Sequence, residues 1–285
     1  MVLPRLLYRW RVRKVEKELL EQLEKTIKVW RPPKYVFSSH DWCDGISNIV
    51  VERKDKKGKI VPIKSAFANG LNAYGLFVLS PIEGVLSITN ADLKLLHAVE
   101  KRIGALDARC SRVDRIELEN ADIENCIGDH LESYSFNAVG INCKDFYARG
   151  SNIGNLYLRG GKVHSCLDLY GSTIKRLEIS GVKLGDLILC DAKVDKLIMD
   201  ETTTLEKIYL TGTEIKSFEG YVPKITQDQY EIDKRTKLPK PLIDKLPGYE
   251  KKYEEAPERK FTGSSSIGLS PIEYASYFIS EYRKD

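Results

Sequence analysis

The chain of 285 residues lacks a long uninterrupted apolar run. No stretch reaches the roughly 18 apolar residues that a membrane-spanning helix requires. Near the start, Arg5, Arg9, Arg11 and Arg13 interrupt anything resembling the apolar segment of a secretory signal. These absences predict a protein without a transmembrane segment, located inside the cell or in a virion.

The sequence also lacks the cysteine and histidine spacings of metal sites. The six cysteines form no CxxC pair and are far apart, and the four histidines are equally scattered. The cysteines are Cys43, Cys110, Cys126, Cys143, Cys166 and Cys190. Since a small thiol packs well in an apolar core, we expect unreactive structural cysteines and no metal.

Glutamine is nearly absent, with Gln22, Gln227 and Gln229 as its occurrences, whereas charged residues make up 30% of the chain. Many charges with few amides is a composition typical of thermophiles, and we expect a thermophilic archaeal source. The net charge of +4 is too small to indicate a nucleic-acid partner by itself.

Signatures of catalysis and cofactor binding are missing as well. The sequence has no phosphate-binding loop and no GxGxxG motif, so no cofactor is expected. Residues 38–45, Ser-Ser-His-Asp-Trp-Cys-Asp-Gly, hold a nucleophile, a base and an acid, but neighbours in sequence rarely face one another as a triad does. A carboxylate cluster, as on β-helix lyases, is the other candidate. Its members would be Asp186, Asp191, Asp195 and Asp200, but Lys183, Lys193 and Lys196 interleave with them.

What the sequence does contain is a five-residue apolar repeat between about Leu86 and Phe218. One run is Ile174, Ile179, Leu184, Leu189, Val194 and Met199. A second series, two residues earlier, alternates small with large residues, so the full unit has ten residues. The apolar register is lost from Gly128 to Gly140, and single-residue slips precede Leu169 and lie near Leu205.

A period of five fits neither a simple helix nor a simple strand. Each unit supplies a short strand followed by a turn in which glycine recurs, and such units stack into a β-solenoid whose coils bury their apolar side against one another. A leucine-rich repeat is the competing interpretation, but it needs 20 to 29 residues per repeat, and the motif here returns after ten.

The repeat resembles that of the pentapeptide-repeat family, whose motif is a small residue, then Asp or Asn, then Leu. Ala91-Asp92-Leu93 and Ala121-Asp122-Ile123 match it. The resemblance implies a right-handed, four-sided β-helix with about twenty residues per coil. Every second small position is a large aliphatic residue, however, which also allows a flatter, two- or three-sided helix as in bactofilin-like proteins.

Residues 1–33 are expected to form a basic amphipathic helix. Tyr8, Val12, Val15, Leu19, Leu23, Ile27 and Trp30 recur every three or four residues. The basic first half predicts contact with an anionic surface, either nucleic-acid phosphates or lipid headgroups. The residues predicted to make that contact are Arg5, Arg9, Trp10, Arg11, Arg13 and Lys14. Packing on the domain or on another copy is the alternative.

The other flanks have distinct compositions. Residues 34–85 are mixed, with a hairpin signal around 54–58, and are expected to cap the solenoid of residues 86–220. Residues 221–269 are rich in Pro, Lys and Glu and predict an extended tail. Residues 270–285 predict a short aromatic helix with Ser270 as N-cap. Its partner-docking side chains would be Ile272, Tyr274, Tyr277, Phe278 and Tyr282.

We therefore expect a mainly β protein without catalytic activity, a rigid solenoid that forms a homo-oligomer or larger assembly through its terminal arms, such as a viral particle or a filament. Two alternatives stay open: a module that binds protein or nucleic acid, and a β-helix enzyme of the lyase or hydrolase type. Mimicry of DNA is not supported, because residues 86–220 carry 21 acidic and 17 basic side chains, a net charge of only −4.

Overall fold

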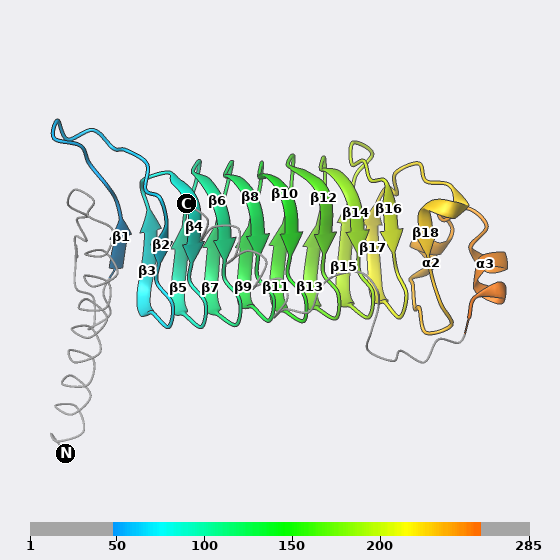
Figure 1. Ribbon diagram of the computed structural model, residues 1–285. Coiled ribbons are helices and arrows are strands. Elements are labelled where there is room, and N and C mark those ends of the chain that lie inside the picture. The colour runs from blue at the N-terminus through cyan, green and yellow to red at the C-terminus, as the bar shows by residue number, and fades with distance from the viewer. Residues whose placement is uncertain (1–47, 258–285) are drawn as a thin grey trace, which may run out of the picture.

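The computed structural model describes residues 48–257, which form a parallel β-solenoid of about 8 turns (Figure 1). Residues paired between neighbouring strands of a sheet are typically 20 apart in sequence, as Asp92 and Arg112 are. Each coil gives one strand to each of two nine-stranded parallel sheets. The coil length of about 20 residues is therefore the one that the resemblance to pentapeptide-repeat proteins implies.

The strands with odd numbers make one sheet, here called the odd sheet. They are β1 (Asn48–Val51), β3 (Asn72–Val78), β5 (Asp92–His97), β7 (Arg112–Glu117), β9 (Glu132–Asn137), β11 (Asn152–Tyr157), β13 (Thr173–Glu178), β15 (Lys193–Met199) and β17 (Glu214–Gly220). The even sheet consists of β2 (Ala66–Phe67), β4 (Ile82–Ser87), β6 (Arg102–Asp107), β8 (Asp122–Ile127), β10 (Asn142–Tyr147), β12 (Lys162–Asp168), β14 (Lys183–Ile188), β16 (Lys207–Tyr209) and β18 (Tyr230–Glu231).

The ten-residue unit explains the burial pattern of each half coil. In the unit containing β5, Ala91, Leu93, Leu96 and Ala98 are buried at 0 to 2% exposure. Two successive positions between Leu93 and Leu96 are not buried, which breaks the strict alternation of a flat strand. The strand therefore bends in its middle, and the apolar positions five apart all face the interior.

Most units end in a turn with one residue in the left-handed region, although the turns at 79–81 and 200–203 have none. Glycine holds that position at Gly140, Gly150 and Gly160, where φ lies between 61° and 68°. Residues with a side chain hold it elsewhere, among them Asn120 and Glu100 at φ of 54° and 55°. The recurrent glycines of the sequence therefore mark corners, as a positive φ favours.

Hydroxyl groups at the inward position after the turn are satisfied by the coil below. Ser111 Oγ donates to the Ile88 carbonyl, and Ser151 Oγ donates to the Gly128 carbonyl at 2.7 Å. Thr213 does the same with Leu189. Because a buried hydroxyl without a partner is costly, these bonds let small polar residues occupy the core.

The repeat does not break between Gly128 and Gly140, contrary to the sequence analysis. β9 pairs with β7 and β11 in register, and Ala138 is fully buried at the expected place. One inward series here is small, with Gly128, Ser133 and Ala138, and the volume comes from Phe136 and Phe146, whose rings lie 5.2 Å apart. Small residues interrupt the apolar pattern of the sequence here, but the strands keep their register because the two phenylalanine rings fill the core.

The slips noted in sequence coincide with irregularities in the coils. β12 has seven residues, and its register with β14 shifts between Val163 and Cys166. A longer turn at 200–204 follows β15. One extra residue is thus absorbed by a bulge or a corner without ending the stack.

The solenoid strands begin before Leu86. β1 pairs in parallel with β3, and Ile63 bridges Ile82 in parallel. The two apolar segments of the expected hairpin therefore pair with strands of the solenoid and not with each other. Antiparallel contact is confined to a short projection, where Lys54 bridges Ile60. The segment 48–85 therefore supplies the first coils and carries a small hairpin between them.

Residues 221–257 pack against the last coils, whereas the sequence analysis expected 221–269 to extend away. A 3-10 helix (Gln227–Gln229), β18, α2 (Lys240–Ile243) and α3 (Tyr249–Glu255) follow one another here. Tyr230 and Leu242 are each 1% exposed. The prolines therefore belong to a folded cap, in which the apolar residues between them are buried in the core. The helix predicted at 270–285 lies outside the described residues.

No helix among residues 48–257 is long and apolar enough to cross a membrane.

Candidate functional surfaces

The residues predicted to contact partners all lie outside the described part of the chain. This holds for the basic set Arg5, Arg9, Trp10, Arg11, Arg13 and Lys14, and for the docking set Ile272, Tyr274, Tyr277, Phe278 and Tyr282. The polar cluster at 38–45 and Cys43 lie outside it too. Candidate surfaces of residues 48–257 are therefore considered on their own.

The four aspartates of the candidate carboxylate cluster do not converge. Asp186 lies on the even sheet and Asp195 on the odd sheet, where Asp195 pairs with Lys216 at 2.7 Å. Asp191, at a corner, pairs with Arg235 at 2.7 Å. Asp200 sits in the turn after β15. Their different places give no shared site for a substrate.

A groove of about 570 Å³ runs across the even sheet, lined by residues of β4, β6, β8, β10 and β12. Its volume lies in the range of small-molecule sites. The charged side chains along it are mixed in sign: Glu83, Arg102, Asp122, Glu124 and Lys144, with His164 at one end.

Polar groups in this groove bond to one another from coil to coil. Asn142 Nδ2 donates to Asp122 Oδ1 at 2.9 Å, and Asn142 Oδ1 lies 2.9 Å from His164 Nε2. Arg102 Nε lies 4.0 Å from Asp122. The Cys143 thiol borders the groove, but the residue is 2% exposed and burial raises its pKa, so it stays protonated. The groove can bind polar groups, yet it presents no activated nucleophile.

Four cysteines of the solenoid are held in the unreactive thiol form. Burial raises the pKa of Cys126 and Cys143, that of Cys166 to about 12, and that of Cys190 to about 11. Since the thiolate is the nucleophile, this fits the structural role expected from the sequence. Cys110 is exposed at a corner.

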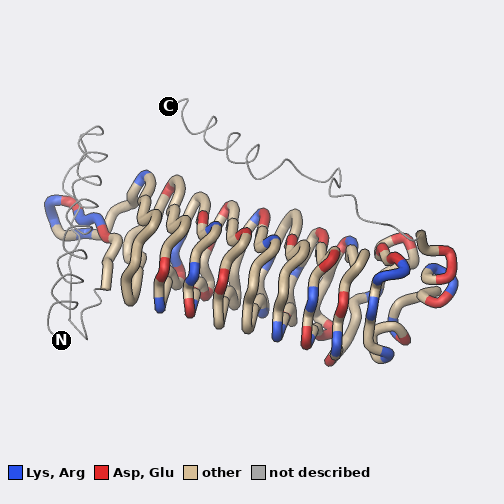
Figure 2. Tube along the Cα trace, turned by 90° about the horizontal axis from the view of Figure 1, so that it is seen from below, with Lys and Arg blue, Asp and Glu red and all other residues tan. Residues whose placement is uncertain are grey.

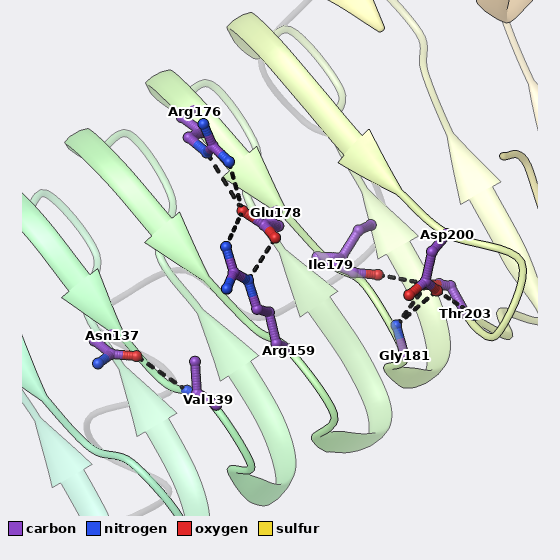
Figure 3. A network of polar contacts seen from close by, with 9 residues as sticks. All are labelled: Asn137, Val139, Arg159, Arg176, Glu178, Ile179, Gly181, Asp200 and Thr203. Carbon is purple, nitrogen blue, oxygen red and sulfur yellow. Dashed lines mark hydrogen bonds and ion pairs between the residues drawn. The ribbon is translucent and has the colours of Figure 1, made fainter. Parts of the chain in front are cut away.

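A network of ion pairs joins successive coils on the outside of the odd sheet (Figure 3). Glu178 accepts from Arg159 at 2.5 and 2.9 Å and from Arg176 at 2.9 Å. The Arg159 hydrogen bond is the main cause that lowers the pKa of Glu178, although burial opposes it. The carboxylate side chain is only 8% exposed, so its partners compensate for lost hydration.

The neighbouring turn is stabilised by Asp200 (Figure 3). Its Oδ1 accepts from Gly181 N–H at 2.8 Å and from Thr203 N–H at 3.0 Å, and Thr203 Oγ1 in turn donates to the Ile179 carbonyl at 2.6 Å. Bonds from backbone and hydroxyl donors, which favour the ionised form, lower the pKa of Asp200 against the opposing effect of burial. Asp200 therefore ties two coils together at their corner.

Similar pairs occur at the other corner of the coils, where the strands of the even sheet end. Arg149 Nε donates to Asp168 at 2.6 Å, and Arg235 bridges Asp191 and Asp233. Figure 2 shows the result along the stack, with acidic and basic residues interspersed rather than gathered in fields of one sign. Within residues 48–257 no group of three or more His, Cys, Asp or Glu could hold a metal ion.

One charged feature was missed by sequence reasoning, which noted only its turn. We call residues 52–64 the basic hairpin. It contains six basic side chains, Arg53, Lys54, Lys56, Lys57, Lys59 and Lys64, against the two acids Glu52 and Asp55. Figure 2 shows it as a mostly blue loop projecting at the β1 end of the stack. A local charge count would have found it.

No model of a known protein family matches the chain, and neither a curated protein nor a solved structure matches it. The similarity to pentapeptide-repeat and bactofilin-like proteins therefore rests on the repeat motif and the solenoid alone.

Proposed function

We propose that this protein is a non-catalytic structural component, a rigid solenoid rod that self-associates or docks through its two ends, as in a viral particle or a filament. The observation that carries the proposal is the internal pairing of the rod's surface charges. Arg149, Arg159 and Arg176 bind carboxylates of their own or adjacent coils, and Arg235 binds Asp191, two coils away. Such networks stiffen a stack and leave few convergent groups for catalysis.

The rod's ends differ from its sides, which supports a role for the ends. Of the six exposed large apolar side chains among the described residues, Ile60, Phe67, Tyr74 and Leu79 belong to the first coils. The residues expected to form terminal arms join the rod at these same ends of residues 48–257. A regular, charge-paired middle with distinctive ends is suited to a spacer.

We further propose that the cross-section is four-sided and the coil right-handed, in the manner of pentapeptide-repeat proteins. Most coils have two corners with a left-handed residue, such as Gly140 and Gly150, and two bends within strands. Four changes of direction per coil support this over the flatter bactofilin-like form.

Light scattering coupled to size exclusion tests the assembly role. We expect the full chain to run as an oligomer, and a variant lacking residues 1–33 and 258–285 to be monomeric with an unchanged far-ultraviolet circular dichroism spectrum. The cut at 258 spares the packed residues 221–257. A monomeric full chain at all concentrations would contradict the proposal, and an oligomeric truncated variant would move the interface onto the rod.

A binding module is the second candidate, and the groove on the even sheet favours it. Asp122, Asn142 and His164 form its polar row. Asp122→Ala should then reduce the amount of any partner that co-purifies with the full chain. Asp195→Ala, at an exposed position on the odd sheet, should leave that amount unchanged. Equal recovery by both variants would argue against the groove.

A further inference from the structure

The basic hairpin is a preformed projection. Asp55 N–H donates to the Lys59 carbonyl at 2.9 Å, and Val61 N–H donates to the Arg53 carbonyl at 2.9 Å. Gly58 closes the turn at a φ of 79°. The base is anchored to the first coils, since Arg53 N–H donates to the fully buried Ser80 Oγ at 2.8 Å. The tip is thus held in place before any partner arrives.

The tip presents cations whose charges are not compensated locally. Lys56, Lys57 and Lys59 are exposed and form no ion pair with another described residue. The one acid of the tip, Asp55, turns its Oδ1 onto the backbone N–H groups of Lys57 and Lys59 at 2.8 and 2.9 Å. The Asp55 carboxylate is therefore bound to the backbone of the turn, while the lysine ammonium groups remain in solvent.

Apolar side chains accompany these lysines. Ile60, next to Lys59, is 43% exposed, and Phe67 on β2 is 50% exposed. The base of the hairpin is packed into the core, because Ile63 is 2% exposed. A charged projection with exposed apolar residues is the arrangement by which proteins lie on a lipid surface: ammonium groups reach headgroups, and apolar groups enter the headgroup and acyl boundary.

We propose that the basic hairpin docks the rod on an anionic lipid surface. The inference rests on the proposed function in one respect, since it names a partner for one end of the rod. Lipid is favoured over nucleic acid because the tip uses lysines, which act as point charges. The single arginine is engaged, as Arg53 Nη1 donates to the Pro62 carbonyl at 3.0 Å. Residues 54–60 contain no aromatic side chain, and Phe67 is a single exposed ring rather than a row on which successive bases could stack.

Co-sedimentation of the full chain with vesicles tests the proposal. The chain should bind vesicles of phosphatidylcholine with phosphatidylserine, in a manner weakened by salt, and not vesicles of phosphatidylcholine alone. The triple variant K56Q/K57Q/K59Q should lower the partition coefficient about a hundredfold, since each basic residue near such a surface contributes about a fivefold gain. Ile60→Ser should lower it severalfold without a change in the salt dependence.

A matched control removes the same charge elsewhere. Lys162, Lys175 and Lys183 are exposed on the coils, so K162Q/K175Q/K183Q should bind vesicles as the wild type does. Wild-type affinity of the hairpin variant, or equal loss in the control, overturns the proposal. So does selective binding of mixed-sequence oligonucleotides that is lost in the hairpin variant while vesicles are ignored. Light scattering of the same samples reports the assembly role separately, because the hairpin variant should keep the wild-type oligomeric state.

Discussion

Individual residues at the corners show why the repeat tolerates departures from its own motif. The left-handed corner position is filled by Gly140, Asn120 and Glu100 alike, although only glycine adopts that backbone freely. Each side chain there costs a small amount of energy, which the regular hydrogen bonds of the stack offset. Glycine spacing in the sequence therefore marks only some corners, and apolar spacing had to supply the others.

At the same scale, Glu178 should make stability depend on pH. Its folded-state pKa lies below the ordinary value of 4.5, because Arg159 and Arg176 favour the carboxylate. Its contribution is therefore fully present above pH 4.5 and is lost as the pH falls through the lowered pKa. Glu178→Gln should reduce the free energy of unfolding by about 1 to 2 kcal/mol at neutral pH, as measured by urea denaturation.

Urea titrations at a series of values below pH 4.5 supply the decisive comparison for Glu178→Gln. The gap between variant and wild type should shrink there, since protonation removes the same ion pairs. Glu124→Gln serves as the control, because Glu124 is exposed and forms no ion pair with a described residue. If the difference in free energy of unfolding stays constant with pH, the substitution acts through packing and not through the charge of Glu178.

At the scale of the strand, volume moves between positions while register stays fixed. Around Gly128 and Ser133 the expected large residues are missing, and Phe136 and Phe146 fill the space from the adjacent inward column. A sequence scan that tests one column at a time sees a break. Strand pairing, which depends on the backbone, shows none.

Phe136→Ala should therefore be among the most damaging single changes in the rod. The ring is fully buried against Phe146, and a Phe to Ala change in a core costs about 3 to 5 kcal/mol from lost burial and the cavity left behind. Thermal and urea unfolding followed by circular dichroism would measure it. Phe136→Leu, which leaves a smaller cavity, should cost less, and the exposed Tyr134→Ala should cost little. Similar losses for Phe136→Ala and Tyr134→Ala would refute the compensation argument.

Elements regular in period were predictable, and those held by tertiary contacts were not. Leu93 and Leu96 could be assigned to the core because spacing alone determines their side. The cap around Tyr230 could not, because its burial depends on residues that fold back over the last coil. The basic hairpin was visible as a turn at Gly58, but its exposure at one end of a rod needed the three-dimensional stack.

For the whole molecule, the two ends of the described rod are unequal. The outer edge of β17 is covered by Lys237, whose N–H donates to the Thr213 carbonyl and whose carbonyl accepts from Ile215. Lys252 lies over the Tyr230 ring at 4.3 Å and bonds to the carbonyls of that residue and of Gln227. On the other side, β1 ends its sheet, and no described strand pairs with its outer edge. Strand edges invite pairing, so we expect association at the β1 end, or through segments outside residues 48–257, rather than at the covered edge of β17.

The closed end yields the last prediction, which compares chains ending at 257 and at 220. Removal of residues 221–257 uncovers Leu210 and Ile215, now 0% and 3% exposed, and frees the edges of β16 and β17. Each newly exposed aliphatic side chain forfeits about 1.5 to 3 kcal/mol of burial. The chain ending at 220 should unfold at lower temperature and aggregate in size exclusion, whereas the chain ending at 257 should match the full chain in melting temperature. Equal melting and solubility of the two truncated chains would show that the last coil needs no cover, and the β1 end would then lose its distinction as the open one.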